Sequence, residues 1–221
     1  MSFARLSFSF ADFSDHRFKE IFMSGMNPNE IRVAGTGRVL VAKVGTTAPA
    51  DATSGWGAGW VDLGYTAPEG VKFGRKGKTV KVNTWQTVGA ARYVYDERDL
   101  TLKFGMLQLN ENTLPFFYGN GDVAETSSGS GTYSFGVTDD ALIEERALGL
   151  EFTDGNEIRY RFIVPRGQVT DTDDMDLNRK GAIKLGVTFT ALPQDGTAPL
   201  ATWIMKDPAF GDKKAPVEDS H

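Results

Sequence analysis

The stretch from Trp60 to Gly74, WVDLGYTAPEGVKFG, contains the pattern on which the fold of this chain rests. Apolar side chains at Val61, Leu63 and Tyr65 alternate with smaller or polar ones, which is the period of a β-strand with one buried face. The run Ala67-Pro68-Glu69-Gly70 then interrupts this alternation with turn-forming residues. The stretch therefore predicts a strand, a turn and a second strand.

Similar signals occur on both sides of this stretch. Residues 31–44, IRVAGTGRVLVAKV, predict two strands joined by a tight turn at Gly35 and Gly37. The long connection from Gly45 to Trp60 is poor in charge and carries Trp56, and loops of this length in compact domains are usually functional. Downstream, a hairpin is predicted with a charged turn at Asp96-Glu97-Arg98-Asp99. Its returning strand places four apolar residues on one face: Leu100, Leu102, Phe104 and Met106.

The second half of the chain predicts another hairpin, with its turn at residues 153–156. After this turn, Ile158, Tyr160, Phe162 and Val164 face one way, and Glu157, Arg159 and Arg161 face the other. The last strong strand carries Ile183, Leu185, Val187 and Phe189 on one face. A helix of about two or three turns begins at an Asn cap near residue 112 and stops at Gly119. We therefore expect an all-β sandwich or barrel-like fold with one short flanking α-helix.

Composition limits the classes of function. A chain of 221 residues with 40% hydrophobic content is long enough for one substantial core. The absence of Cys excludes disulfides, thiolate metal sites and a cysteine nucleophile. No apolar run approaches the roughly 18 residues of a membrane helix, so no membrane insertion is expected. The net charge of −5 disfavours a protein that grips phosphates through clustered Lys and Arg.

Catalytic and metal-binding patterns are weak. The two histidines, His16 and His221, stand near opposite ends of the sequence, which does not suit a Ser-His-Asp arrangement or a histidine metal site. The acidic run DTDDMDLN, residues 171–178, offers oxygen ligands but lacks the Gly and the distal Glu of an EF-hand loop, so a solvated turn is preferred. The Gly-Arg and Gly-Lys motifs lack Walker spacing. We expect no enzyme, no cofactor and no metal; a small carboxylate-dependent hydrolase is the most distant alternative.

The tryptophans support a rival hypothesis. Trp56, Trp60, Trp85 and Trp203 together would provide a stacking platform for sugars, which makes a carbohydrate-binding β-sandwich the alternative function. In a β-rich chain, packing of these rings in the core or in an interface is the preferred interpretation.

The order and wording of several motifs resemble one known family. The run GRVLVAKVGTTAPADATSGWGAGWVDLGYTAPEGVKF, residues 37–73, is followed by Trp85-Gln86, by LTLKFGMLQLNENTLPFFYG at residues 100–119 and by KLGVTFTALP at residues 184–193. This order resembles the major tail tube protein of long-tailed, non-contractile bacteriophages, over roughly Asn29 to Pro193.

The resemblance implies a structural virion protein. Six subunits would form a ring, and stacked rings would form a tube through which the genome leaves. The loop containing Ala48, Pro49, Trp56 and Trp60 would contact an adjacent ring, with the two tryptophans as anchors, and would become ordered only on assembly. The implied partners are other copies of the chain, the tape measure protein, the tail terminator and the distal tail proteins. The implied location is the virion, after assembly in the cytoplasm of the bacterial host.

An acidic channel suits such a tube, because duplex DNA carries about one negative charge per 1.7 Å and would bind to basic walls. Duplex DNA would then pass without adhering. The candidate lumen acids fall into two groups, which are Asp96, Glu97 and Asp99, and Asp171, Asp173, Asp174 and Asp176.

The expected organisation has three parts: an extension over residues 1–28, a tail tube β-sandwich domain over residues 29–193 and a tail over residues 194–221 whose last residues are disordered. The tail is too short for the immunoglobulin-like decoration domain that many relatives carry. The segment before Asn29 departs from the family pattern, and we expect translation to begin at Met23 or Met26, with residues 1–22 an artefact of the assigned start.

Overall fold

The computed structural model describes residues 26–138 and 143–211, with backbone only for residues 95–98. The chain divides into two units, Met1–Val33 and Ala34–His221. In the described part of the first unit, Pro28–Glu30 form the 3₁₀ helix η1, and the side chain of Asn27 caps it by accepting a hydrogen bond from the Asn29 amide at 3.1 Å. The expected artefact over residues 1–22 and the expected disorder of the last residues lie outside the described residues.

The second unit contains an eight-stranded antiparallel sheet and a small separate hairpin. In the described part of the chain, the large sheet comprises β1 (Thr36–Lys43), β2 (Val61–Asp62), β3 (Lys72–Asn83), β4 (Ala90–Met106), β7 (Arg146–Asp154), β8 (Ile158–Thr172), β9 (Leu185–Ala191) and β10 (Thr202–Lys206). Their order is β2-β1-β7-β8-β9-β4-β3, and β10 pairs with β8. The small hairpin consists of β5 (Ala124–Glu125) and β6 (Tyr133–Ser134).

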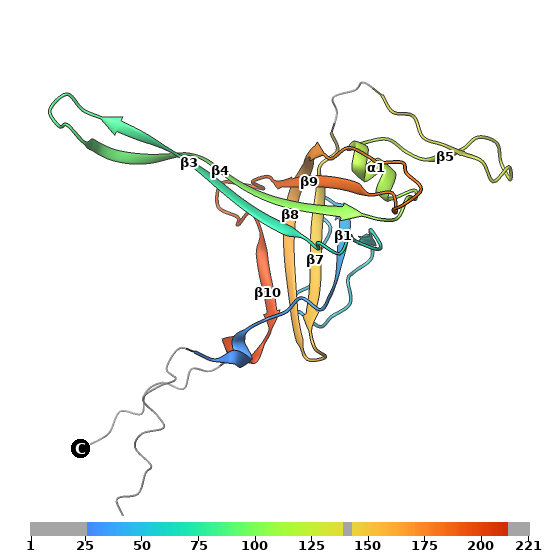
Figure 1. Cartoon of the computed structure of the whole chain (residues 1–221), viewed down its shortest axis with the longest axis horizontal. Helices are drawn as coiled ribbons and strands as arrows, with labels where there is room; N and C mark the ends of the chain where they lie inside the picture. The colour runs from blue at the N-terminus through green and yellow to red at the C-terminus, as the bar shows by residue number, and fades with distance from the viewer. Residues whose placement is uncertain (1–25, 139–142, 212–221) are drawn as a thin grey trace, which may run out of the picture. The chain divides into compact units, whose positions relative to one another are not determined.

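The long strand β8 allows the sheet to fold back on itself. Its first half, up to Val164, pairs with β7 and β10, and its second half pairs with β9; Gly167, where the halves meet, lies opposite both Arg146 of β7 and Ala191 of β9. Figure 1 shows that β9, β4 and β3 consequently run across the direction of β7, β8 and β10. The predicted all-β class with one short helix is confirmed, and the sheet is not closed.

The core lies between these two halves of the sheet. It contains apolar side chains of β1, β7 and the first half of β8 together with those of β4 and β9: Val39, Val41, Leu148, Leu150, Phe162, Val164, Leu102, Phe104, Met106, Leu185, Val187 and Phe189. The predicted apolar rows of β4 and β9 thus do supply the core. The exposed arm and loops extend from this core.

The helix α1 (Thr113–Tyr118) covers one side of the core. The ring of Phe116 stacks against Phe104 and Phe189, with centroids 6.2 and 6.1 Å away. The side chain of Asn110 begins the helix by accepting hydrogen bonds from the amides of residues 112 and 113. Gly119, at φ 83°, ends it in the left-handed conformation that glycine adopts without strain. The stop is as predicted, but the helix is shorter than expected.

Two strand predictions need correction, and one strand was not predicted. Residues 31–35 form no strand, and Gly37 lies inside β1 and not in a turn. The hairpin of β3 and β4 turns at residues 84–89, and residues 96–99 belong to β4. Acidic residues remain in this ladder because they lie opposite cations, Glu97 opposite Lys78 and Asp99 opposite Lys76. The strand β10, in the expected tail, was missed.

Candidate assembly surfaces

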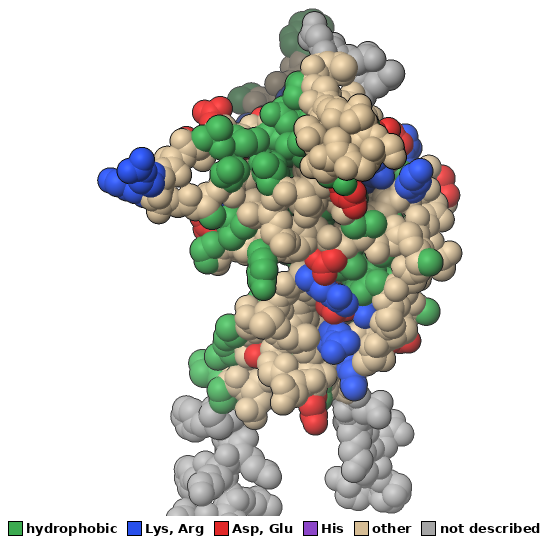
Figure 2. Space-filling view, turned by 90° about the vertical axis from the view of Figure 1, so that its right-hand side faces the viewer, with side chains coloured by type: hydrophobic (Ala, Val, Ile, Leu, Met, Phe, Trp, Pro, Cys, Tyr) green, Lys and Arg blue, Asp and Glu red, His purple; other side chains and the backbone are tan. Residues whose placement is uncertain are grey.

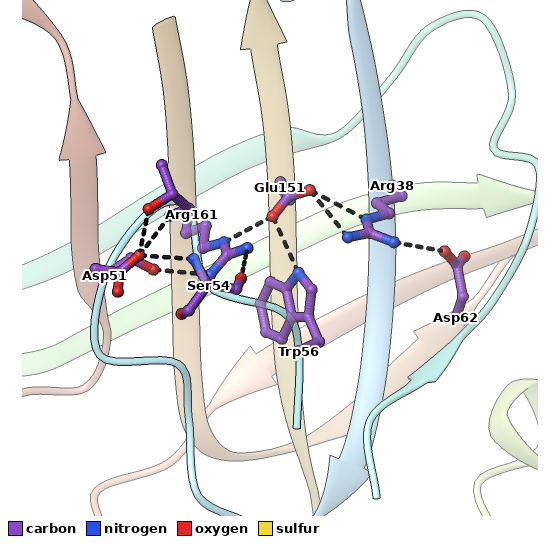
Figure 3. Close-up of polar contacts among 8 residues, drawn as sticks. Arg38, Asp51, Ser54, Trp56, Asp62, Glu151 and Arg161 are labelled. Carbon is purple, nitrogen blue, oxygen red and sulfur yellow. Dashed lines mark hydrogen bonds and ion pairs between the residues drawn. The ribbon is translucent and has the colours of Figure 1, made fainter. Parts of the chain in front are cut away.

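The loop between β1 and β2, residues 44–60, is fastened to the outer face of its own sheet. Three charged residues lie directly opposite one another on neighbouring strands: Arg38 on β1, Glu151 on β7 and Arg161 on β8. The loop covers the Arg161 end of this row (Figure 3). Alternation along β8 correctly predicted that Arg161 points away from the core, but the loop buries it, and only 1% of the residue is exposed.

Each nitrogen of the Arg161 guanidinium donates a hydrogen bond. Its Nε donates to Glu151 Oε2 at 2.6 Å, Nη1 donates to the Asp51 carbonyl at 2.7 Å and Nη2 donates to the Ser54 carbonyl at 2.6 Å. A buried cation is tolerated only when it is paired and hydrogen-bonded in this way. Because two of the acceptors are backbone carbonyls of the loop, Arg161 fixes the path of the loop itself.

Glu151 is the middle residue of the row and contacts both arginines. Its Oε2 also accepts from Trp56 Nε1 at 3.0 Å, and its Oε1 accepts from Arg38 Nη2 at 3.0 Å. Burial would raise the pKa of Glu151, but hydrogen bonds from Arg161 and Trp56 and the charges of both arginines bring the pKa below its usual value. Glu151 is therefore a buried anion that links Trp56 of the loop to Arg38 on β1 and Arg161 on β8.

The two tryptophans pack against each other and against a glycine. Their ring centroids are 4.8 Å apart in an edge contact, and Trp60 Nε1 donates to the Thr47 carbonyl at 3.0 Å. A Cβ at Gly149 of β7 would lie 2.4 Å from the Trp56 ring and 3.0 Å from Trp60, so the rings occupy the space that a side chain would need. The Arg161 guanidinium lies 5.0 Å from the Trp56 ring centroid.

A turn inside the loop is held by Asp51. Its Oδ1 accepts hydrogen bonds from the amides of Ser54 and Thr53 and from the Thr53 hydroxyl. These bonds lower the pKa of Asp51 to about 2. Pro49 is buried and Ala48 is half-buried in the same loop. The loop thus has many contacts within its own chain, which differs from the expectation that it becomes ordered only on assembly; its contact with an adjacent ring stays a prediction.

The second surface is an arm formed by β3 and β4. β4 pairs with β9 only from Thr101 onward. Among the described residues, β3 and β4 therefore continue from Arg75 to Leu100 as a two-stranded ribbon with no third strand (Figure 1). Val80, Val82 and Val94 are more than two-fifths exposed on one face of this arm. At its tip, Trp85 is 99% exposed.

The predicted lumen acids lie in two places. Asp96, Glu97 and Asp99 lie along β4 and not at a hairpin tip; the side chain of Asp99 is exposed, and those of the other two are outside the description. Asp171 is the next-to-last residue of β8, and Asp173, Asp174 and Asp176 follow this strand as exposed residues. Asp173 Oδ1 lies 3.9 Å from Lys103 Nζ. That any of these acids faces a channel stays a prediction.

The tryptophans do not form a common platform. Trp56 and Trp60 pack in the loop, Trp203 packs against Phe73 and Phe162, and Trp85 stands alone at the tip of the arm. The residues that the structure describes contain no group of three His, Asp or Glu side chains arranged to hold a metal. Over the same residues, no helix is long and apolar enough to cross a bilayer.

Sequence reasoning missed the row of Arg38, Glu151 and Arg161. Each of these residues occupies an outward position on a strand, where a charge normally indicates solvent. The only signal in the sequence was the upstream glycine-rich loop with its two tryptophans. Nothing in the sequence of that loop indicates which surface it covers.

Comparison with known proteins agrees with the resemblance of the motifs. A family model described as Phage tail tube protein matches residues 24–216. A comparison with curated proteins gave no match. Because the family model covers most of the chain, the chain belongs to the phage tail tube protein family and is a structural protein of the phage tail.

Proposed function

We propose that copies of this chain assemble into stacked hexameric rings, and that these rings form the tail tube through which the genome passes into the host. Family membership supports the structural role and the self-assembly into a tube with other tail proteins. Assembly in the host cytoplasm, with a tape measure protein inside the tube and terminator and distal tail proteins at its ends, belongs to the same proposal.

The observation that carries the proposal is the arm of β3 and β4. An isolated two-stranded hairpin is marginally stable in water, and unpaired strand edges readily bind another chain. Between Arg75 and Leu100 this arm has exposed valines, and neither of its edges pairs with another strand of the described residues. Such a surface is explained when neighbouring subunits cover it, as they do in a closed assembly.

The charge of the chain suits a conduit for DNA. Six copies at a net charge of −5 give a ring with a formal charge of −30, which repels duplex DNA and prevents adhesion. In this arrangement, acids that line the channel belong to the two candidate groups, which are Asp96, Glu97 and Asp99, and Asp171, Asp173, Asp174 and Asp176.

The loop from Ala48 to Trp60 presents a preformed surface to the adjacent ring. Arg161 and Glu151 hold its backbone and Trp56 in place before assembly, so little conformational entropy is lost on contact. The exposed residues of the loop, such as Thr53 and Gly57, are then the part that meets the next ring.

The test is negative-stain microscopy of the purified chain, beginning at Met23, over a series of rising concentrations. We expect stacked rings or tubes with a central channel above a critical concentration, and sixfold symmetry in end-on views. A chain that remains monomeric at every concentration, including with preformed tube fragments added as seeds, would refute the proposal.

A further inference from the structure

The tip of the arm presents two apolar side chains that the described part of the chain leaves exposed. Trp85 is 99% exposed, and Val88 beside it is fully exposed. The turn that carries them is shaped locally, because the hydroxyls of Thr84 and Thr87 lie 2.8 Å apart and Thr87 Oγ1 donates to the Gly89 carbonyl at 3.0 Å. An ordered turn that presents an indole ring to solvent is typical of a binding anchor.

The arm behind the tip is basic on balance. Residues 75–100 contain six of the 24 basic residues of the chain and three of its 29 acidic residues, which leaves 18 basic against 26 acidic residues elsewhere. The basic residues are Arg75, Lys76, Lys78, Lys81, Arg92 and Arg98, and the acidic ones are Asp96, Glu97 and Asp99. Lysines on an edge strand oppose pairing with an identical edge, so two arms repel each other. The charge favours docking on the acidic body of another copy.

The body offers a cleft of about 680 Å³ between the segment leading into α1 and the strand β6. This volume is within the range of about 300–1,000 Å³ that is typical of clefts that enclose a small ligand. The cleft is lined by Leu109, Leu114, Val123, Tyr133 and Phe135, with Glu111 as its charged residue. Figure 2 looks onto this end of the body and shows hydrophobic side chains gathered there, with acidic and basic side chains around them.

The arm cannot fill the cleft of its own chain. Trp85 is eleven residues beyond Gly74 along β3, which corresponds to a reach of roughly 35 Å away from the sheet. Figure 1 shows the tip of the arm at one end of this unit and α1 with β5 at the other. An arm that fills this cleft must therefore come from a second copy.

We propose that Trp85, at the tip of the arm, docks in the cleft beside α1 of a neighbouring copy, with Lys81 and Arg92 directed toward its acidic surface. This inference rests on the proposed function, because it names the contact that joins subunits of the tube. The indole ring supplies apolar burial, and the basic stem of the arm sets the orientation.

Cross-linking tests this contact directly, because the chain has no Cys and each introduced thiol is unique. Gln86→Cys, beside the anchor, and Ser134→Cys, at the cleft, are prepared separately, mixed, assembled and treated with a short bismaleimide. We expect a covalent two-chain product that forms only from the mixture. The matched control pairs Gln86→Cys with Asp174→Cys, which lies in the exposed acidic run after β8. Tubes that yield no product with Ser134→Cys, or that yield product only with Asp174→Cys, would overturn the docking and leave the proposed function intact.

A second experiment measures the critical concentration for tube formation. Trp85→Ala should raise it at least about tenfold, as expected when a central aromatic anchor is removed. The matched control is Tyr65→Ala, an aromatic residue that is 76% exposed outside the arm and the cleft, and it should leave the critical concentration unchanged. Because Trp85 contacts almost nothing in its own chain, both variants should melt like the wild type. Equal critical concentrations for Trp85→Ala and the wild type would refute the anchor, whereas a wild type that forms no tubes would refute the proposed function itself.

Discussion

Arg161 links the sheet of this protein to its longest loop. It lies directly opposite Glu151 on the neighbouring strand, and its remaining nitrogens reach two carbonyls of the loop. A buried ion pair of this kind adds little net stability when compared with an apolar core, but removal of one partner is costly. Its contribution here is to specify a single position for the loop.

The first prediction concerns this pair. Glu151→Gln removes the carboxylate that is hydrogen-bonded to the buried Arg161, so we expect a loss of about 3–5 kcal/mol in the free energy of unfolding. Urea denaturation followed by far-UV circular dichroism measures this change. Glu157→Gln, an exposed residue in the turn between β7 and β8, is the matched control and should change stability by less than about 0.5 kcal/mol. Equal losses in the two variants would contradict the role of the pair.

The second prediction concerns pH. Folding lowers the pKa of Asp51 from 3.8 to about 2, so its stabilising effect is present above pH 3.8 and disappears as pH falls toward 2. The pKa of Glu151 is also lowered from 4.5, and its contribution is lost in the same direction. We expect the tryptophan fluorescence of the loop to change on acidification below about pH 4. Asp51→Asn keeps an oxygen acceptor without a titrating group, so the change should be smaller between pH 4 and 2; an unaltered acid transition would contradict this assignment.

At the scale of the element, β7 and its loop fit together because Gly149 has no side chain. A methyl group there would lie 2.4 Å from the Trp56 ring. Gly149→Ala should therefore displace the indole rings and cost about 1–3 kcal/mol, with a shift in tryptophan emission. Gly55→Ala in the same loop is the matched control, because its Cβ would meet no atom within 4 Å. A Gly149→Ala variant with wild-type stability and emission would show that the rings do not depend on this gap.

The arm is an element that the folded core does not need. Among the described side chains, the core cluster takes none from residues 75–99. Replacement of residues 79–96 by Asn-Gly, which favours a two-residue hairpin turn between Lys78 and Glu97, should keep the melting temperature within about 4 °C of the wild type. The same variant should form no tubes in sedimentation or microscopy. Normal tubes from the shortened chain would exclude the arm from assembly.

For the whole molecule, the proposed docking predicts that the separation of charge between the arm and the rest of the chain affects association. Attraction between a basic arm and an acidic body is screened by salt, with a Debye length that falls from about 10 Å at 0.1 M to about 3 Å at 1 M. We expect the critical concentration for tube formation to rise several-fold between about 0.05 and 0.5 M NaCl. Light scattering at a series of protein concentrations measures this change. A critical concentration that falls with salt would indicate association by apolar contact alone.

The sequence by itself determined the elements whose patterns are local. The apolar rows of β4, β8 and β9, the turn at Gly155 and the helix stop at Gly119 follow from side-chain alternation and from glycine conformations, which are properties of neighbouring residues. The order of the motifs also indicated the tail tube family, and the family model confirmed it.

Only the tertiary structure decided how these elements meet. Arg161 has the sequence pattern of a solvent-facing charge, and it is buried because a loop more than a hundred residues earlier in the chain covers it. The acids at 96–99 have the composition of a turn, and they stay in a strand because lysines of β3 lie opposite them. In both cases the deciding partner is distant in sequence, and pairing across strands depends on register, which local composition does not encode.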